Sequence, residues 1–270
     1  MKDLFPRTAV NLIHETTFEA YQEALRNVWY KFDFKSSPRG LPIREIMDYS
    51  FRVVNPTADS IITFDEERNK VIHSYTEKEK ELYNSCTNKV EDFAKASKFW
   101  NHLANPDGTV NSAYGYLIWE NRSAGDPNYE YEDISVTTDI KEWDKHMRTP
   151  WEWSKQCLIV DKDTRQAIMR FSLPEHQWMG NKDQTCTMHG NWLIRNDMLH
   201  LSITMRSNDL MKGLVYDLPW FCSLMDRMVE ELKPTYPNLE KGWYTHNVHS
   251  MHIYEKDEAA IMKMIGVDGE

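Results

Sequence analysis

The spacing of apolar residues near the start of the chain predicts a helix followed by a strand. Apolar side chains recur every three or four positions on one helical stripe: Phe18, Tyr21, Leu25 and Val28. Residues Thr16 to Glu19 have the form of a capping box, so the helix is expected to begin there and to run to about Tyr30. Residues 35–42 contain two prolines and a glycine and predict a loop, and Tyr49 to Val54 predicts a strand.

The next part of the chain is more polar and more helical. Residues 64–95 are highly charged, and within them Thr76 to about Tyr83 has helical propensity. Lys95 to Leu103 predicts a second helix that ends before an Asn-Pro pair. Residues 105–112 and 121–136 are polar, carry Gly or Pro, and are expected to be loops.

The second half of the chain is richer in strand patterns. The expected strands are Cys157–Val160, Ala167–Ser172, Thr187–Ile194, Met198–Met205 and Val248–Tyr254. Asn196-Asp197 suits the two-residue turn of a β-hairpin. Asp217-Leu218-Pro219 predicts the start of a helix to about Leu232, and a last helix is expected from Glu255 to about Ile265. This is the pattern of an α+β fold with a mixed β-sheet, and residues 1–270 are expected to form a single domain.

Charge and composition narrow the possible functions. With 32 Lys and Arg against 42 Asp and Glu, the net charge is −10, which argues against a nucleic acid polymer as partner. Neither of the two common glycine-rich phosphate loops occurs, so any phosphate must be held by side chains. No apolar run is long enough to span a membrane, and no export signal is seen at the N-terminus. The expected location is therefore the cytoplasm, with reduced cysteines.

Cys186 is the candidate nucleophile. It lies at the start of the predicted hairpin, after a polar loop, where reactive side chains are commonly displayed. The second strand returns toward Cys186, so Arg206 is a plausible cation to favour the thiolate. The alternative is a packed thiol beside a surface arginine. His246, His249 and His252 recur every three residues, a spacing that does not suit a zinc site, and no metal is expected. The 33 aromatic residues suggest that some line a site for flat rings.

Several motifs together resemble the thymidylate synthase superfamily, and within it the deoxycytidylate (dCMP) hydroxymethylase branch of phages. The motifs are Phe99-Trp100, the run Asn111 to Gly115, Asp163-Thr164-Arg165, Cys186, Arg206-Ser207-Asn208-Asp209 and His252-Ile253-Tyr254. They follow the family's order and cover about residues 37–255. The resemblance implies a thymidylate-synthase-like fold whose sheets pack across a homodimer.

The resemblance also implies a mechanism. The thiolate of Cys186 adds to C6 of a pyrimidine nucleotide, and C5 then attacks the one-carbon unit of 5,10-methylenetetrahydrofolate, which is the co-substrate. Hydroxymethylases finish by adding water, whereas thymidylate synthases finish by hydride transfer. Glu79 is the implied general acid/base, with Glu77 and Glu81 as alternatives. The structural alternative is that Glu79 only occupies the third helical position of a capping box that begins at Thr76. Tyr114 matches an aromatic near the nucleophile.

Substrate contacts carry over residue by residue. Arg206, Ser207 and the neighbouring Asn208 match the nucleotide-binding motif, and Arg39 matches a phosphate-loop arginine. Arg165 matches an arginine that reaches the phosphate of the other subunit, but Gln166 stands where the family usually has a second arginine. The implied sugar contacts are His252 and Tyr254, and the implied folate contacts are Trp100 and Asp209.

Asp217 occupies the position that reads the base. Eleven residues after the motif arginine, thymidylate synthases carry Asn, and this chain carries Asp217, as dCMP hydroxymethylases do. A carboxyl group accepts from the cytosine amino group and shares a proton with cytosine N3, whereas uracil places an acceptor opposite it. The alternative is that Asp217 only caps the helix. The expected activity is dCMP hydroxymethylation, with dCMP methylation or a dUMP enzyme as rivals and a non-catalytic nucleotide-binding protein as the alternative class.

Overall fold

The computed structural model describes residues 12–59, 62–121, 123–124 and 147–267, and these group into two units. Unit 1 comprises Met1–Lys78, His200–Arg227 and Lys241–Glu270, and unit 2 comprises Glu79–Leu199 and Met228–Glu240. Each unit has its own packing and is described separately. The expectation of a single domain over the whole chain stays a prediction.

A mixed sheet is the framework of unit 1. Its strands are β1 (Leu12–Thr16), β2 (Phe34–Ser36), β3 (Ile43–Asn55), β8 (Met198–Met205), β9 (Asn208–Asp209) and β10 (Glu240–Tyr254). β1 runs parallel to β3, and β2 and β10 run antiparallel to it. β9 is parallel to β10, with Asp209 opposite His252, and β8 is the other neighbour of β10. The two predicted strands at residues 49–54 and 248–254 are confirmed as parts of the longer β3 and β10.

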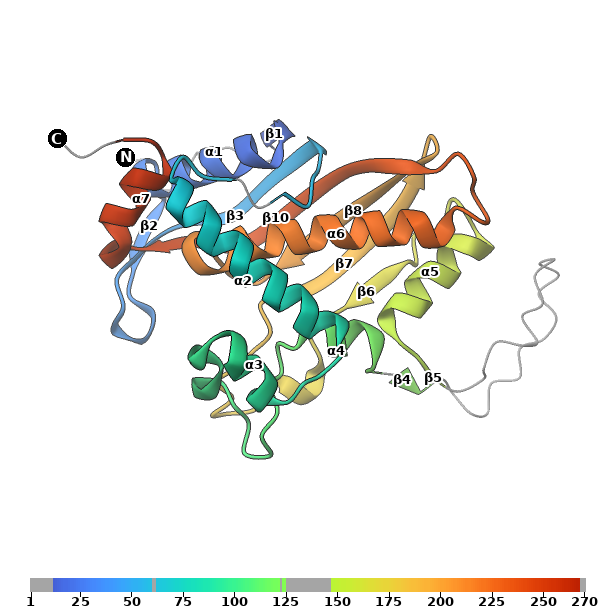
Figure 1. Cartoon of the computed structure of the whole chain (residues 1–270), viewed down its shortest axis with the longest axis horizontal. Helices are drawn as coiled ribbons and strands as arrows, with labels where there is room; N and C mark the ends of the chain where they lie inside the picture. Colours follow the sequence, from blue (N-terminus) through green and yellow to red (C-terminus); the bar gives the residue numbers. More distant parts are fainter. Residues whose placement is uncertain (1–11, 60–61, 122, 125–146, 268–270) are drawn as a thin grey trace, which may run out of the picture. The chain divides into compact units, whose positions relative to one another are not determined.

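Helix α1 (Thr17–Tyr30) covers β1 and β3, as Figure 1 shows. The predicted capping box is confirmed, because the Thr16 side chain accepts a hydrogen bond from the Glu19 backbone and the Glu19 carboxylate accepts one from the Thr16 backbone. The stripe that faces the sheet contains Tyr21, Leu25 and Val28, all fully buried. Burial of such side chains is worth about 1.5–3 kcal/mol each. The C-terminal turn η6 (Glu255–Asp257) and helix α7 (Glu258–Met264) confirm the last predicted helix.

Two long-range hydrogen bonds hold the segment that leads into helix α6 (Val215–Leu232). This segment, η5 (Leu210–Leu214), is a π-helical turn. The Tyr21 hydroxyl donates to the carbonyl of Leu210 at 2.9 Å, and Arg68 donates to the carbonyl of Met211 at 2.6 Å. Arg68 lies on helix α2 (Glu66–Asn84), which starts ten residues earlier than predicted. These contacts fix the backbone that carries Gly213 and the first turn of α6.

The described part of unit 2 contains two antiparallel strand pairs and several short helices. β6 (Ile168–Arg170) pairs with β7 (Thr187–Arg195), and β4 (Ser123–Ala124) pairs with β5 (Met147–Arg148). The helices are α3 (Val90–Ala96), α4 (Tyr114–Trp119) and α5 (Pro150–Val160), and the 3₁₀ turns are η2 (Lys98–His102) and η4 (Pro174–His176). Unit 1 also contains a short 3₁₀ turn, η1 (Pro38–Gly40), which lies inside the loop predicted at residues 35–42.

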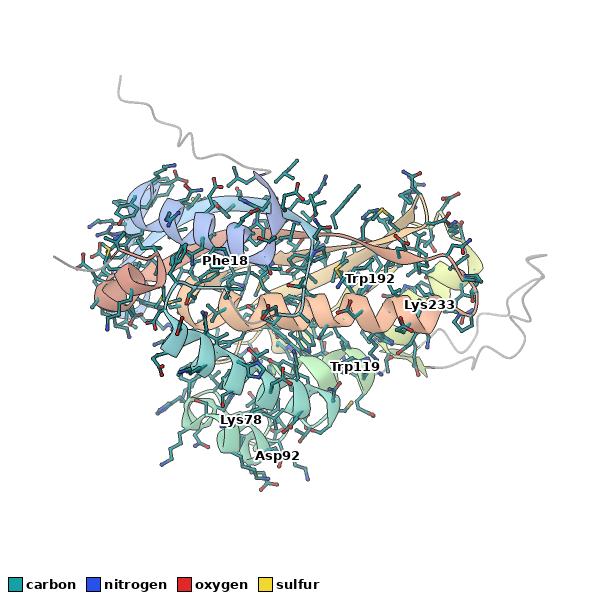
Figure 2. All side chains as sticks on the ribbon, turned by 45° about the horizontal axis from the view of Figure 1, so that its top comes forward. Phe18, Lys78, Asp92, Trp119, Trp192 and Lys233 are labelled. Atoms are coloured by element: carbon teal, nitrogen blue, oxygen red, sulfur yellow. The ribbon has the colours of Figure 1, made fainter. Side chains whose placement is uncertain are left out.

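Closely packed aromatic rings fill the interior of unit 2. Trp151 contacts Trp119 and Trp192 edge-on, with ring centroids 5.7 and 6.0 Å apart, and Figure 2 labels the latter two rings. Tyr83 stacks on Tyr114 at 5.6 Å, and Tyr114 meets Phe171 at 5.2 Å. Such pairs add about 0.5–1.5 kcal/mol beyond burial. Much of the aromatic surplus noted in the sequence therefore builds this core.

Three predicted elements need correction or lie outside the description. Residues 157–160 form the end of α5 and not a strand, because Thr149 and Glu152 make a capping box with Pro150 in the first turn. The helix predicted at 95–103 is broken at Ser97, whose backbone is extended. The loop predicted at 121–136 lies mostly outside the described residues.

The predicted turn at residues 196–197 is confirmed. Asn196 and Asp197 both have positive φ, 52° and 57°, between β7 and β8. A type I′ hairpin turn requires positive φ at both central residues.

Candidate active site

Cys186 directly precedes β7 in unit 2, on a half-buried backbone segment. Its neighbour Thr187 is fully buried and donates hydrogen bonds to the Tyr114 hydroxyl, from Oγ1 at 2.9 Å and from the backbone N–H at 3.4 Å. The structure therefore places Tyr114 beside the segment that carries Cys186. None of the four cysteines, all within the described residues, forms a disulfide.

A polar network ties the loop before Cys186 to the start of α4. The carboxylate of Asp183 accepts hydrogen bonds from the Ser112 backbone at 2.8 Å and from the Ser112 hydroxyl at 2.5 Å. Asn111 donates to the backbone carbonyl of Asp183 at 3.1 Å and to the side chain of Asn181 at 3.2 Å. The run Asn111 to Gly115 thus supports the Cys186 loop directly. Sequence reasoning missed Asp183 and Asn181, which have no pattern beyond being polar loop residues.

The candidate Glu79 lies on the helical face that meets Tyr114. Tyr83, four residues later on α2, is buried and stacks on Tyr114. Glu79 is half-buried on that same face, whereas Glu77 and Glu81 are exposed on the opposite side. Of the three glutamates left open by the sequence, the helix geometry favours Glu79. The capping-box interpretation of Glu79 is wrong, because Thr76 lies in the interior of α2, which begins at Glu66.

Gly115 makes the close contact between α4 and α2 possible. A Cβ atom at Gly115 would lie 1.9 Å from the carbonyl oxygen of Tyr83. Only glycine permits this approach of one backbone to another. The contact fixes the stacking of Tyr83 on Tyr114 and, through Thr187, the base of the Cys186 segment.

The other unit 2 candidates differ in exposure. Trp100 is 8% exposed and packs on Phe93 with ring centroids 4.7 Å apart, so little of its indole faces outward. Arg165 and Gln166 are exposed in the loop between α5 and β6. The backbone of Gln166 is anchored by Thr164 and by Trp153, whose indole donates to the Gln166 carbonyl at 3.1 Å.

In unit 1, the ends of β9 and β10 gather the sugar and phosphate candidates. Ser207 Oγ lies 3.5 Å from His252 Nδ1, and that nitrogen also lies 3.2 Å from the carbonyl of Ser250. His252 meets Tyr254 edge-on at 5.7 Å. Arg206 is exposed next to Ser207. Ser207, His252 and Tyr254 thus form one cluster, with Arg206 at its edge.

Arg39 and Asp209 have clear local roles. Arg39 is exposed in η1 with φ 54°, beside Gly40 with φ 79°, and the structure describes no side-chain contact between it and the Ser207 cluster. Asp209 caps η5, because its carboxylate accepts from the Met211 backbone at 2.8 Å. Burial raises the pKa of Asp209, and His252 opposes that rise.

Asp217 is a half-buried residue inside the first turn of α6. The helix begins at Val215 after the π-helical turn, so the interpretation of Asp217 as the N-cap is wrong. Burial raises the pKa of Asp217 to about 7, and a hydrogen bond from Asn208 Nδ2, 2.9 Å from Oδ2, opposes the rise. A carboxyl with this pKa exists in both the neutral and the charged form near neutral pH. It can therefore both donate and accept hydrogen bonds.

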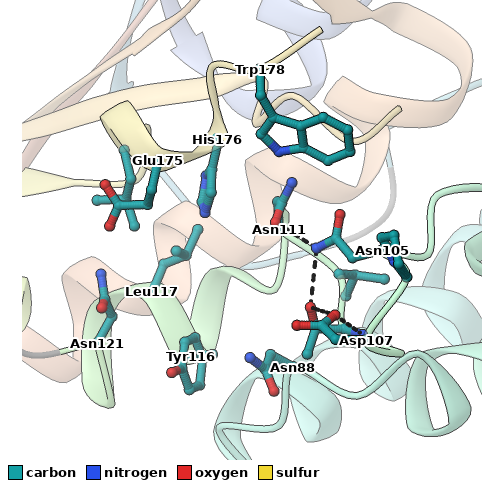
Figure 3. A pocket seen from close by; sticks show the side chains of 14 residues that line it. Asn88, Asn105, Asp107, Asn111, Tyr116, Leu117, Asn121, Glu175, His176 and Trp178 are labelled. Atoms are coloured by element: carbon teal, nitrogen blue, oxygen red, sulfur yellow. Dashed lines mark hydrogen bonds between the residues drawn. The ribbon is translucent and has the colours of Figure 1, made fainter. Parts of the chain in front are cut away.

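A cavity of about 550 Å³ opens elsewhere in unit 2 (Figure 3). Its lining includes Asn105, Asn111, Tyr116, His176 and Trp178. Asn105 donates to Asn111 at 2.8 Å, so the cavity wall and the Cys186 support network share Asn111.

Neither a metal site nor a membrane-spanning helix is found among the described residues. No group of three or more His, Cys, Asp or Glu side chains is placed to hold a metal ion. No described helix combines the length and apolar character needed to cross a membrane.

The candidates divide between the two units. Those in unit 2 are Glu79, Trp100, Tyr114, Arg165 and Cys186, and those in unit 1 are Arg39, Arg206, Ser207, Asn208, Asp209, Asp217, His252 and Tyr254. The predicted partnership of Cys186 with Arg206 joins the two sets and stays a prediction.

The chain belongs to the thymidylate synthase family, whose family model matches residues 19–266. It is 27% identical over 231 residues to deoxycytidylate 5-hydroxymethyltransferase of Enterobacteria phage T6, covering 83% of this chain and 80% of that protein. It is 30% identical over 169 residues to deoxyuridylate hydroxymethyltransferase of Bacillus phage SP01, covering 59% of this chain and 39% of that protein. The solved thermostable thymidylate synthase A of Bacillus subtilis matches with a TM-score of 0.61 and 15% identity, over 93% of this chain and 84% of that one.

These findings establish the fold and the kind of chemistry. The mixed sheet flanked by helices is the thymidylate synthase fold, as predicted. The family consists of one-carbon transferases that act on a nucleotide with methylenetetrahydrofolate as co-substrate.

Proposed function

We propose that this protein hydroxymethylates C5 of dCMP, with methylenetetrahydrofolate supplying the one-carbon unit and water the hydroxyl group. The observation that carries the proposal is Asp217, a half-buried carboxyl whose pKa is raised by desolvation to about 7, at the position that the family motif gives to the base-reading residue. A neutral carboxyl donates one hydrogen bond to cytosine N3 and accepts one from the cytosine amino group. One protonation state thus satisfies both polar edges of the base.

The remaining roles follow the family motif. Cys186 is the nucleophile that adds to C6, and Glu79 moves protons at the base. Arg206 and Ser207 hold the phosphate, with Arg39 as a further phosphate contact, and His252 and Tyr254 hold the sugar hydroxyl. Tyr114 supports the nucleophile through Thr187, to which it is hydrogen-bonded at 2.9 Å.

The two folate candidates fit supporting roles. Asp209 commits one oxygen to the Met211 backbone and retains a second carboxyl oxygen for a ligand. Trp100 offers little surface, because it is only 8% exposed. Phe99, its neighbour in the motif, is 60% exposed and offers a larger apolar surface.

We also propose that the protein acts as a homodimer in which Arg165 reaches the partner's nucleotide phosphate. The strands of unit 1 carry exposed apolar side chains, among them Ile13, Met47 and Trp243. Arg52 lies 4.4 Å over the Trp243 ring, which itself lies 3.7 Å from the His200 ring. Flat, partly exposed groups of this kind are typical of subunit interfaces. The relationship to the T6 phage enzyme supports action in the cytoplasm of an infected cell.

Two rival activities use the same residues. A dCMP methyltransferase would end in hydride transfer instead of water addition. A dUMP hydroxymethylase is favoured by the Bacillus phage relative, whose name gives deoxyuridylate as substrate. The neutral form of Asp217 can also bind uracil, if its donor and acceptor oxygens exchange places.

One assay separates these activities. The protein is incubated with methylenetetrahydrofolate and dCMP, dUMP or CMP, and the nucleotide and folate products are identified by mass. Hydroxymethyl-dCMP with tetrahydrofolate is the expected result. Methyl-dCMP with dihydrofolate would support the methyltransferase, and conversion of dUMP alone would overturn the proposal. The Asp217→Asn variant is expected to shift preference toward dUMP.

A further inference from the structure

We propose that Asn208 is a positioning residue that fixes the hydrogen-bond polarity of Asp217 and thereby sets which pyrimidine the protein accepts. The inference rests on the proposed function, because it assumes that Asp217 reads the base. It changes the role of Asn208 from a direct substrate contact, as predicted from the sequence, to a residue that acts through Asp217.

The geometry assigns the two oxygens of Asp217 different tasks. Asn208 Nδ2 lies 2.9 Å from Asp217 Oδ2, and the amide is 2% exposed on β9. An amide nitrogen only donates, so Oδ2 must accept. When Asp217 is neutral its proton therefore lies on Oδ1. The pair presents one fixed acceptor and one fixed donor.

Packing alone does not explain a buried amide at this place. Among the described residues, Asn208 Oδ1 has no hydrogen-bond partner. The amide nitrogen has two neighbours, Asp217 and the Met205 sulfur, which lies 2.8 Å away. Burying an unpaired amide oxygen costs about 1–3 kcal/mol, a cost that leucine of similar size would avoid. The amide is thus present for its bond to Asp217.

The backbone around the pair is shaped to hold it. A Cβ atom at Gly213 would lie 2.8 Å from Asn208 Oδ1 and 3.4 Å from Asp217 Oδ2. Only glycine at residue 213 leaves the amide and the carboxyl in their positions. The π-helical turn that carries Gly213 is in turn fixed by Tyr21 and Arg68. The carboxyl and its donor are therefore held rigidly.

Among the groups around Asp217, Asn208 is the one that polarises the Asp217 carboxyl. Tyr244 on β10 and Cys222 on α6 share this buried region, and burial raises the pKa of Tyr244, with Cys222 and Asp217 adding to the rise. Because its pKa is raised, Tyr244 is neutral near pH 7. Burial and the Asn208 hydrogen bond are the two influences on the pKa of Asp217.

The consequence for specificity follows from the two bases. Cytosine presents an acceptor at N3 and a donor at its amino group, whereas uracil presents a donor at N3 and an acceptor at O4. A neutral carboxyl whose proton can move between its oxygens suits either base. A carboxyl whose proton Asn208 holds on one oxygen can pair with only one of the two bases. Loss of Asn208 is therefore expected to relax the choice of base.

The test compares Asn208→Leu with the unmodified protein. We expect the ratio of kcat/KM for dCMP over dUMP to fall at least about tenfold, as for loss of one hydrogen bond to a charged group. The pH midpoint of dCMP turnover is expected to move upward by about one unit, because the charged form of Asp217 loses the hydrogen bond that stabilises it. A general loss of packing would lower both substrates together and leave the midpoint in place.

Asn27→Leu is the matched control, since Asn27 is also a buried amide in unit 1, 5% exposed and bonded to Tyr49. It is expected to leave both the ratio and the midpoint unchanged. Asn208→Ala is measured in parallel, and whichever Asn208 variant folds decides the test. An unchanged ratio and midpoint in a folded Asn208 variant would overturn the inference. If the unmodified protein converts neither nucleotide, the proposed function fails instead.

Discussion

The region of unit 1 around Asp217 and the region of unit 2 that carries Cys186 each contain a hydrogen-bonded aspartate, and the two carboxyl groups are held differently. In unit 2 the carboxylate of Asp183 accepts two hydrogen bonds from Ser112, and this anchors the loop before Cys186. In unit 1 Asp217, which is half-buried, accepts one hydrogen bond, from Asn208, and desolvation of its carboxyl group raises its pKa to about 7.

The same contrast extends to the surroundings. Unit 2 positions its nucleophile with aromatic stacking and a close backbone contact at Gly115, which set geometry and change little with pH. Unit 1 positions a titratable group under a rigid turn, which makes its hydrogen bonding depend on pH. We therefore expect changes in unit 2 to act on rate and stability, and changes at Asp217 to act on substrate choice and pH dependence.

The largest effect is expected for Cys186→Ala. If Cys186 is the nucleophile, the variant loses at least about 10⁴-fold in kcat, because no covalent adduct with C6 can form. Thermal unfolding should be almost unchanged, since the side chain is small and half-buried. Product analysis by mass provides the measurement. A folded variant with full activity would instead indicate a non-catalytic nucleotide-binding protein.

The second effect concerns Asp217 and the pH dependence of stability. The folded pKa of about 7 lies above the ordinary value of 3.8, so the folded protein keeps a proton that the unfolded chain releases. Stability therefore falls as pH rises from about 4 to about 7, by up to about 4 kcal/mol at 1.36 kcal/mol per pKa unit. Asp217→Asn should lack this decline and be the more stable protein at pH 8. Urea unfolding at pH 4.5, 6 and 8 provides the measurement, and parallel curves would contradict it.

The third effect tests the rigid support in unit 2. Gly115→Ala places a Cβ atom 1.9 Å from the Tyr83 carbonyl, so α4 and α2 must separate. The expected loss is about 1–3 kcal/mol of stability, accompanied by reduced kcat from displacement of Tyr114. Gly108→Ala is the control, because its Cβ would meet nothing within 4 Å and costs only the strain of φ 80°. Equal losses of stability in the two variants would show that the contact of Gly115 with the Tyr83 carbonyl has no special role.

Much of this arrangement could be predicted from local sequence patterns. The capping box at Thr16 and the hairpin turn at Asn196 each depend on residues close in sequence. The helix α5 could also have been found, because Thr149, Pro150 and Glu152 carry a capping signal that outweighs the β-branched residues at 157–160.

The remaining features depend on contacts between distant residues. The π-helical turn before α6 is held by Tyr21 and Arg68, about 190 and 140 residues away in the chain, so its effect on the start of α6 has no local signal. Asp183 likewise acquires its role only when Ser112 is brought to it. The pKa of Asp217 depends on burial, which sequence spacing alone does not give.

The smallest expected effect concerns Gln166, the neighbour of the proposed phosphate-binding Arg165 in unit 2. Gln166 stands where the family usually has a second arginine, and its side chain is exposed while its backbone is fixed by Thr164 and Trp153. Gln166→Arg should therefore leave stability within about 0.5 kcal/mol. If Arg165 reaches the phosphate, a second guanidinium beside it is expected to lower KM for dCMP a few-fold, because paired guanidinium groups bind phosphate well. Steady-state kinetics at low and high salt provide the measurement, with Arg170→Gln, an exposed position on β6, as control. An unchanged KM would place the phosphate charge among the arginines of unit 1, and the division of tasks between the two units would then be sharper still.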